Sequence, residues 1–275
     1  MLREFDKEGV PFLRWIGGKQ RLISELVASL PSDIAGATYH EPFFGAGAVF
    51  AAVRPAHSFI SDANSHLVAM YDAVRNEPRK VFETLRRLAR HHTEVDYYKV
   101  RSGYNRGNSP TLQAARFIYL NRTSYNGIFR VNQNGQYNVP YGRLERAIIP
   151  SFATLSQWSA ILHNAQLVAR SFEKMVDDIH SGDVVYLDPP YPPTNGTAYF
   201  THYTWDRFDI AKQRATADLA MILDHRGCRV MISNADTDGI RKLYKGWRIK
   251  RTRVARVVTA RGVPYRAREL ILTNY

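Results

Sequence analysis

The sequence contains a single cysteine, Cys228, and no long apolar run. One cysteine cannot form a disulfide within the chain, which fits a reducing compartment. No apolar run approaches the roughly 18 residues that a membrane-spanning helix needs. The N-terminal stretch M1-L-R-E-F-D-K-E8 is charged and does not resemble a secretory signal. These absences predict a soluble, cytoplasmic protein that does not enter a membrane.

Acidic residues are scarce relative to basic ones, and the formal net charge is +13 over 275 residues. The stretch 248–268 is nearly free of acids, and a second basic stretch at 101–146 is interleaved with Tyr, Asn and Gly. Basic surfaces attract polyanions because each neutralised phosphate releases counterions. Aromatic residues among the basic ones favour nucleic acid over a membrane surface. The alternative is a basic protein whose charge serves solubility alone.

The chain is long enough for one large domain, or for a core with an insertion. Patterns typical of α/β structure occupy both ends. We expect strands at 38–43, 57–61, 165–169, 184–187, 229–233, 247–258 and 269–274, and helices at 19–30, 46–54, 63–73 and 207–224.

The middle of the chain has a different pattern. Residues 78–100 are expected to form one helix and 112–120 another, and Asn134-Gly135 between β-forming residues predicts a hairpin. We therefore expect an α/β core made of residues 1–74 and 161–275, interrupted by an insertion at 75–160.

Two glycines, Gly45 and Gly47, follow an expected strand and precede an expected helix. Glycine lets the backbone turn tightly and approach a ligand, and Asp62, at the end of the next strand, could accept hydrogen bonds from a ribose diol. The sequence has no G-K-S/T phosphate loop here, and Phe50 stands where a dinucleotide fingerprint needs a small residue. The pattern favours a nucleoside ligand without a pyrophosphate. The alternative is a glycine turn in which Asp62 caps a helix.

A further candidate element is P11-F-L-R-W-I-G-G-K19, which places Lys19 just after a Gly-Gly turn. Lys19 could bind a carboxylate, and Trp15 could lie against a cationic or aromatic group. The alternative is a core tryptophan beside a surface lysine.

The stretch V184-V-Y-L-D-P-P-Y191 ends an apolar strand with an acid, two prolines and a tyrosine. Asp188 falls at the carboxyl end of the strand, where open α/β sheets bind ligands. Pro189 ends the strand because it has no N–H for the sheet ladder. A carboxylate beside a fixed carbonyl suits an exocyclic amino group, and Tyr191 offers a face on which a base can stack. The alternative is an acidic strand end before a proline-rich loop.

Six stretches together resemble the Dam-type DNA adenine-N6 methyltransferases, in that family's order and over almost the whole chain. They are W15-I-G-G-K19, E41-P-F-F-G-A-G47, S61-D-A-N64, L120-N-R-T-S-Y-N-G-I-F-R130, Y137-N-V-P-Y-G-R143 and D188-P-P-Y191. The resemblance implies an α/β fold with a Rossmann-like seven-stranded methyltransferase sheet. It also implies an inserted, mainly helical target-recognition domain that carries a β-hairpin, S-adenosyl-L-methionine as cofactor, and no metal.

By this resemblance, Asp188, the carbonyl of Pro189 and Tyr191 form the catalytic group around a flipped adenine. The implied cofactor-binding residues are Trp15, Lys19, Phe43, Gly45, Gly47, Asp62, Phe172 and Asp188. The implied DNA-binding residues are Arg14, Tyr125, Asn126, Ile128, Arg130, Asn132, Pro140 and Arg143. Among these, Arg130 matches a guanine-reading arginine, and Tyr125 and Asn126 match positions that fill the stack when the base leaves.

The target segment favours GATC or a related site, although Arg14 and Leu144 depart from residues common in the family. The resemblance implies double-stranded DNA as partner and a monomeric, bacterial or phage-encoded protein associated with the nucleoid. A cognate restriction endonuclease is left open as a second partner. Two other functions are also left open: an amino methyltransferase acting on cytosine N4 or on RNA, and a non-enzymatic DNA-binding regulator.

Overall fold

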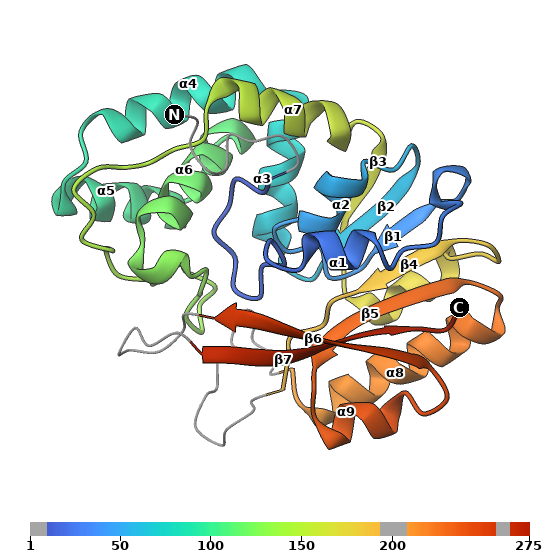
Figure 1. The fold of residues 1–275 in the computed structure, drawn as a ribbon. Coiled ribbons are helices and arrows are strands. Elements are labelled where there is room, and N and C mark those ends of the chain that lie inside the picture. The colour runs from blue at the N-terminus through green and yellow to red at the C-terminus, as the bar shows by residue number, and fades with distance from the viewer. Residues whose placement is uncertain (1–9, 193–207, 257–264) are drawn as a thin grey trace.

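The computed structural model describes residues 10–192, 208–256 and 265–275 of the chain, and within them seven strands form one sheet in the order β3-β2-β1-β4-β5-β7-β6. Their bounds are β1 Tyr39–Glu41, β2 Ser58–Asp62, β3 Ala165–Ala169, β4 Val184–Leu187, β5 Arg229–Ala235, β6 Arg248–Arg256 and β7 Tyr265–Thr273. The strands from β3 to β5 are parallel, whereas β7 runs antiparallel to β5 and β6 (Figure 1). The seven-stranded α/β sheet expected from the sequence is confirmed.

The strand order reverses between β1 and β4, because β1 leads on to β2 and β3 on one side and pairs with β4 on the other. In open parallel sheets, ligands bind at the carboxyl ends of strands at such a reversal. The chain leaves β1 into the glycine loop and leaves β4 into Asp188. The topology therefore brings the two candidate stretches to the same edge of the sheet.

Helices cover both faces of the sheet. Their bounds are α1 Ile23–Val27, α2 Ala48–Val53, α3 Ser65–Asn76, α4 Pro78–Arg90, α5 Glu94–Asn105, α6 Pro110–Thr123, α7 Phe152–Leu162, α8 Ile210–His225 and α9 Asp238–Leu243, with 3-10 turns η2 Ile34–Gly36, η3 Tyr125–Gly127 and η4 Phe172–Asp178. Val184 and Tyr186 of β4 join the apolar cluster that contains α2 and α3, whereas Val185 and Leu187 join the cluster of α8 and α9. Alternate residues of β4 thus face opposite layers, as in a strand buried on both sides.

Two expected helices differ from the structure. The helix expected over 78–100 is two helices, α4 and α5, since the chain turns at His91 and Thr93 caps α5 by accepting a hydrogen bond from the Asp96 amide at 3.1 Å. The helix expected over 19–30 is shortened to α1, whose N-cap residue Leu22 has no capping side chain. Lys19 precedes that helix. Of the remaining expected elements, residues 207 and 257–258 lie outside the described residues.

The expected hairpin is present between α6 and α7. Isolated bridges join Ser124 to Tyr141 and Val131 to Tyr137, and the amide of Asn132 donates to the carbonyl of Gln136 at 2.8 Å. Gly135 has a φ of 72°, a left-handed conformation that suits glycine at the end of such a loop.

The segment between α3 and β3 contributes no strand to the described sheet and forms a helical layer of α4, α5 and α6 beside it (Figure 1). Its buried side chains belong to the same continuous apolar cluster as Tyr39 and Tyr186 of the sheet. The division at residues 75 and 160 is therefore not marked by a break in packing, and it stays a prediction. Among the described helices, none has the length and apolarity needed to cross a membrane.

Candidate active site

A buried ion pair joins the N-terminal segment to the end of β4. The Nζ atom of Lys19 lies 2.7 Å from Oδ2 of Asp188, with the lysine side chain 5% exposed and the aspartate 18% exposed. Lys19 also donates to the carbonyl of Gly17 at 2.7 Å, and its ammonium lies 4.6 Å from the centre of the Tyr191 ring. The carboxylate that Lys19 binds is thus Asp188, and the structure gathers Lys19, Asp188 and Tyr191 at one place.

The other oxygen of Asp188 accepts a hydrogen bond from the neighbouring strand β5. Oδ1 accepts a hydrogen bond from the hydroxyl of Ser233 at 2.6 Å, and the Tyr186 hydroxyl lies 2.8 Å from the same Ser233 oxygen. Ser233 and Tyr186 are buried. Sequence reasoning did not single out either residue.

The rest of the D-P-P-Y turn is fastened from α8, β5 and β7. Gln213 donates to the carbonyl of Pro190 at 2.7 Å and itself accepts from the Asn234 amide group at 3.0 Å. The Tyr191 hydroxyl donates to Glu269 at 2.9 Å. Gln213, Asn234 and Glu269 are buried polar residues on α8, β5 and β7, and sequence reasoning did not single out any of them.

The glycine loop and Asp62 are joined directly. The Gly45 amide donates to Oδ2 of Asp62 at 2.9 Å, and the Asn64 amide donates to Oδ1 at 2.8 Å. Gly45 and Gly47 have φ values of 49° and 64°, and a Cβ on Gly47 would lie 2.6 Å from the Phe44 ring. Both features require glycine. Asp62 does not cap the next helix, because the N-cap of α3 is Asn64.

Two carboxyl groups lie at the strand reversal in different surroundings: Asp188 is half-buried and Glu41 is buried. Burial raises the pKa of Asp188, while the Lys19 ammonium and the Ser233 hydroxyl act in the opposite direction. Burial raises the pKa of Glu41 to about 8, and its carboxyl accepts from the Tyr39 hydroxyl at 2.7 Å. Glu41 stands in the glycine-loop stretch, but sequence reasoning did not name it as a site residue.

Aromatic rings lie beside the glycine loop. Phe43 and Phe172 have ring centres 4.9 Å apart, and Phe208, which sequence reasoning missed, lies 5.8 Å and 6.0 Å from them. On the other side of the loop, a Cβ on Gly45 would lie 3.0 Å from the ring of Trp15. The Trp15 ring stacks in turn on Phe117 of α6 and on Phe129, which follows η3.

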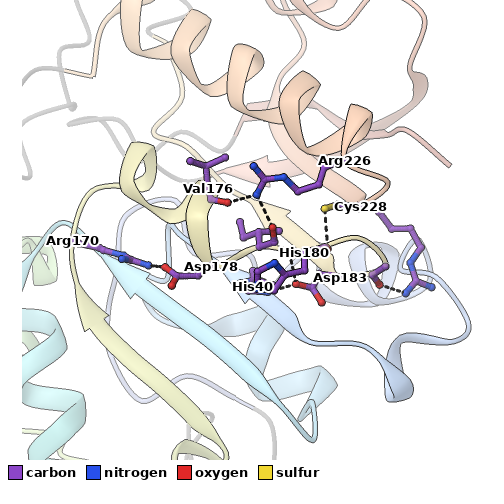
Figure 2. A network of polar contacts seen from close by, with 11 residues as sticks. His40, Arg170, Val176, Asp178, His180, Asp183, Arg226 and Cys228 are labelled. Atoms are coloured by element: carbon purple, nitrogen blue, oxygen red, sulfur yellow. Dashed lines mark hydrogen bonds and ion pairs between the residues drawn. The ribbon is translucent and has the colours of Figure 1, made fainter.

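A network of polar contacts fastens η4, the turn that begins at Phe172 (Figure 2). Arg226 donates to the carbonyls of Val176 and Ile179, and Arg170 pairs with Asp178.

The same network reaches β1 and Cys228, the residue before β5. His40 lies 2.9 Å from Asp183, and the Cys228 thiol lies 3.2 Å from the carbonyl of His180 (Figure 2). Burial lowers the pKa of His40, and the neighbouring carboxylate of Asp183 acts in the opposite direction. These contacts hold η4, the turn that begins at Phe172, against the sheet.

The residues at this edge fit a nucleoside. Asp62 presents a half-buried carboxylate to a diol, and the Phe43–Phe172 pair offers an aromatic wall. In the described part of the chain, no group of three or more His, Cys, Asp or Glu side chains is arranged to hold a metal ion.

The residues expected to contact DNA lie on the hairpin and the turn before it. Tyr125 is 54% exposed, and Asn126 beside it has a φ of 56°, in the left-handed region that asparagine tolerates. The Tyr125 amide donates to the carbonyl of Pro140 at 2.9 Å, which joins the two strands of the hairpin base. Arg130 is exposed and donates to the Asn138 side chain at 2.7 Å.

Other predicted DNA contacts differ in exposure. Arg143 and Pro140 are exposed and Ile128 is half-buried. Asn132 serves the hairpin turn, since its side chain accepts from the amides of Asn134 and Gln136 at 3.0 Å and 2.9 Å.

Arg14 is held at this turn through its backbone. Its amide donates to the Asn121 side chain at 2.8 Å, and its carbonyl accepts from the same side chain at 2.7 Å. Asn121 also donates to the carbonyl of Gly127 at 3.1 Å. A Cβ on Gly127 would lie 2.6 Å from the Arg14 side chain, so glycine is needed there.

Residues 15–259 match the family of D12 class N6 adenine-specific DNA methyltransferases. Since this match covers most of the chain, the protein belongs to that family and is an adenine-specific DNA methyltransferase.

Named relatives are similar over nearly the whole length. The Type II methyltransferase M.MjaIII of Methanocaldococcus jannaschii is 35% identical over 285 residues, covering 96% of this chain and 99% of the relative. The Type II methyltransferase M1.LlaDCHI of Lactococcus lactis is 34% identical, covering 96% and 95%. The DNA adenine methylase of Escherichia coli K12 is 33% identical, covering 93% and 91%. Among solved structures, a precorrin 8w decarboxylase of Methanobacterium thermoautotrophicum is similar at a TM-score of 0.41 and 12% identity, covering 95% of this chain and 94% of that chain.

Proposed function

We propose that this protein transfers a methyl group from S-adenosyl-L-methionine to N6 of an adenine flipped out of double-stranded DNA. The observation that supports this most strongly is the Asp188–Tyr191 turn. It presents a buried carboxylate and a tyrosine ring together at the strand reversal, where the ammonium of Lys19 is already held between them.

The cofactor would lie along the glycine loop. We assign Gly45 and Gly47 to close backbone approach, Asp62 to the ribose, and Phe43 with Phe172 to the adenine ring. Trp15 would line the loop from the side of the inserted segment. When bound, the cofactor supplies a methyl group on a positively charged sulfur.

The target adenine would stack on Tyr191 and direct its amino group at Asp188 and the carbonyl of Pro189. The N6 nitrogen is a poor nucleophile because its lone pair is delocalised into the ring. Accepting both amino hydrogens favours a more tetrahedral nitrogen and aims the lone pair at the methyl group, so positioning supplies much of the catalysis. Positive charge develops on N6 during transfer, and the carboxylate of Asp188 stabilises it.

Lys19 would have to move for the base to stack, because its ammonium lies 4.6 Å from the centre of the Tyr191 ring. The sequence-based assignment of Lys19 and Asp188 to the cofactor is compatible with this movement. Lys19 would then face the amino-acid end of the cofactor.

DNA would lie against the hairpin and the turn before it. Tyr125 and Asn126 are exposed there and would fill the stack when the base leaves. Arg130 would exchange its bond with Asn138 for guanine, to which arginine bonds through O6 and N7.

Further contacts in this proposal set the target site. Ile128 and Pro140 would contact a thymine methyl group, and Arg14, Asn132 and Arg143 would contact the flanking duplex. We propose GATC or a related site as the target. We also propose a cytoplasmic, nucleoid-associated monomer, with a cognate restriction endonuclease as a second partner where one is encoded.

The test is to express the protein in a host without DNA methylation and to map N6-methyladenine by sequencing. Methylated adenine confined to one short motif is the expected result. Duplex DNA and RNA treated with labelled cofactor and digested to nucleosides provide the control. Label in N4-methylcytosine or in RNA would support the alternative methyltransferases, and DNA binding without label would support a regulator.

A further inference from the structure

The two oxygens of the Asp188 carboxylate have different partners. Oδ1 accepts from the hydroxyl of Ser233 at 2.6 Å, whereas Oδ2 bonds to Nζ of Lys19 at 2.7 Å. The lysine nitrogen also lies over the Tyr191 ring, so Oδ2 is the oxygen that faces the stacking surface. Oδ1 faces the interior of the sheet.

The strand register places Ser233 beside Asp188. Strands β4 and β5 are parallel, and Leu187 pairs with Ile232, so the next residues of both strands lie side by side. The side chains of neighbouring strands at paired positions point to the same face of a sheet. The contact is therefore a direct consequence of the sheet.

The direction of the hydrogen bonds follows from the number of protons. An ionised carboxylate only accepts, so Ser233 donates its single proton to Asp188. The Tyr186 hydroxyl, 2.8 Å from the Ser233 oxygen, is then the donor to Ser233. Tyr186 and Ser233 are both buried, which makes water an ineffective replacement for either bond.

We propose that Ser233 is a positioning residue for methyl transfer: it holds Oδ1 of Asp188 so that Oδ2 alone meets the amino group of the target. This inference rests on the proposed function, which gives Asp188 the role of acceptor. It also divides the acceptors of the turn. Asp188 supplies one oxygen, and the carbonyl of Pro189 accepts the second amino hydrogen, while the carbonyl of Pro190 accepts from Gln213.

Several other groups influence the ionisation of Asp188. Lys19 of the N-terminal segment lowers its pKa and Glu269 of β7 raises it. Asp188 in turn raises the pKa values of the groups that face it: Tyr39 and Glu41 of β1, Tyr186 of β4 and Tyr191 of its own turn. Ser233 differs from Lys19 and Glu269 because its hydroxyl is neutral: it lowers the pKa of Asp188 through a hydrogen bond, which also fixes the direction of the carboxylate.

The test is the single-turnover methylation rate of Ser233→Ala on duplex DNA, measured from pH 5 to pH 9. We expect a fall of about tenfold or more at neutral pH, the scale of a lost hydrogen bond to a charged group. The affinities for DNA and for S-adenosyl-L-methionine should stay within a few-fold. The acidic limb of the rate profile should move to higher pH, and Tyr186→Phe should produce a smaller shift in the same direction.

A matched control is Ser159→Ala, which removes another buried serine, one whose hydroxyl donates to the Arg75 carbonyl at 2.6 Å. It measures the general effect of losing such a bond and should leave the acidic limb in place. If Ser233→Ala does not fold, Ser233→Cys keeps a weak donor of similar shape and should show a partial loss with a partial shift.

The Asp188→Asn variant distinguishes a failure of the proposed role of Asp188 from a failure of the inference about Ser233. If Asp188→Asn methylates DNA at the wild-type rate, the proposed role of Asp188 fails, and the role of Ser233 fails with it. If Asp188→Asn is inactive while Ser233→Ala behaves like Ser159→Ala, with its acidic limb unmoved, only the inference about Ser233 is overturned.

Discussion

The ammonium of Lys19 lies 2.7 Å from Oδ2 of Asp188, at the place that the proposed function gives to the amino group of the target. Three features of the position suit a nitrogen that carries protons: the carboxylate, the Gly17 carbonyl and the face of the Tyr191 ring. Lys19 thereby offsets the negative charge of Asp188. Its position shows which groups would surround a substrate nitrogen bound at the same place.

Replacing Lys19 by methionine should destabilise the protein, because it leaves Asp188 buried without an opposite charge. We expect a loss of up to about 3 kcal/mol in the free energy of unfolding at pH 8. The loss should be smaller at pH 5, where Asp188 can take up a proton. Urea denaturation measures both values. The double variant Lys19→Met with Asp188→Asn should recover most of the loss, and simple additivity of the two substitutions would contradict the ion pair's role.

Replacing Asp62 by alanine should weaken cofactor binding at least tenfold, since Asp62 both faces the proposed ribose site and holds the Gly45 amide. DNA affinity should be unchanged. Calorimetric titration with S-adenosyl-L-methionine gives the first value and a duplex binding assay the second. Asp72→Ala, a half-exposed aspartate on α3, is the control and should bind cofactor normally.

Glu41 should make the protein less stable as the pH rises. Its pKa is about 8 in the fold and 4.5 without the fold's influence, so between these values the folded state holds more protons than the unfolded state. Stability then falls as the pH increases through this window. Glu41→Gln should remove the dependence and be the more stable protein at pH 8.5. Urea denaturation at pH 5, 7 and 8.5 checks this, and an unchanged slope would exclude Glu41 as the cause.

Much of this site could be predicted from the sequence because its main groups follow apolar strands directly. Asp188 follows β4, Gly45 follows β1, and Asp62 ends β2. The local sequence pattern and the rule that ligands bind at the carboxyl ends of parallel strands were therefore enough to predict that these residues share one edge of the sheet. Lys19 was predicted to bind a carboxylate, but the partner could not be identified, since Asp188 is far from it in sequence.

The supporting residues could not be predicted in the same way. Ser233 and Glu269 reach the D-P-P-Y turn only through the register of β4, β5 and β7, which is a property of the assembled sheet. The break between α4 and α5 was missed because the apolar spacing continues across it, while the Thr93 cap that starts α5 was overlooked.

Replacing Arg130 by alanine should relax the preference for one base pair of the target. A bidentate contact of arginine to guanine contributes about 1–3 kcal/mol of discrimination, so the ratio of rates on matched and mismatched duplexes should fall by roughly tenfold or more at that position. Arg86→Ala, an exposed arginine on α4, is the control and should keep the ratio. A uniform loss on every duplex would instead make Arg130 a phosphate contact.

The most direct test of the central claim is the single-turnover rate of methyl transfer by Asp188→Asn on a duplex that carries the mapped target. Asparagine keeps the shape of the side chain and removes the charge that stabilises a positive N6. We predict a rate at least about 100-fold below wild type, with DNA affinity within a few-fold. A rate within threefold of wild type would contradict it and remove Asp188 from the mechanism.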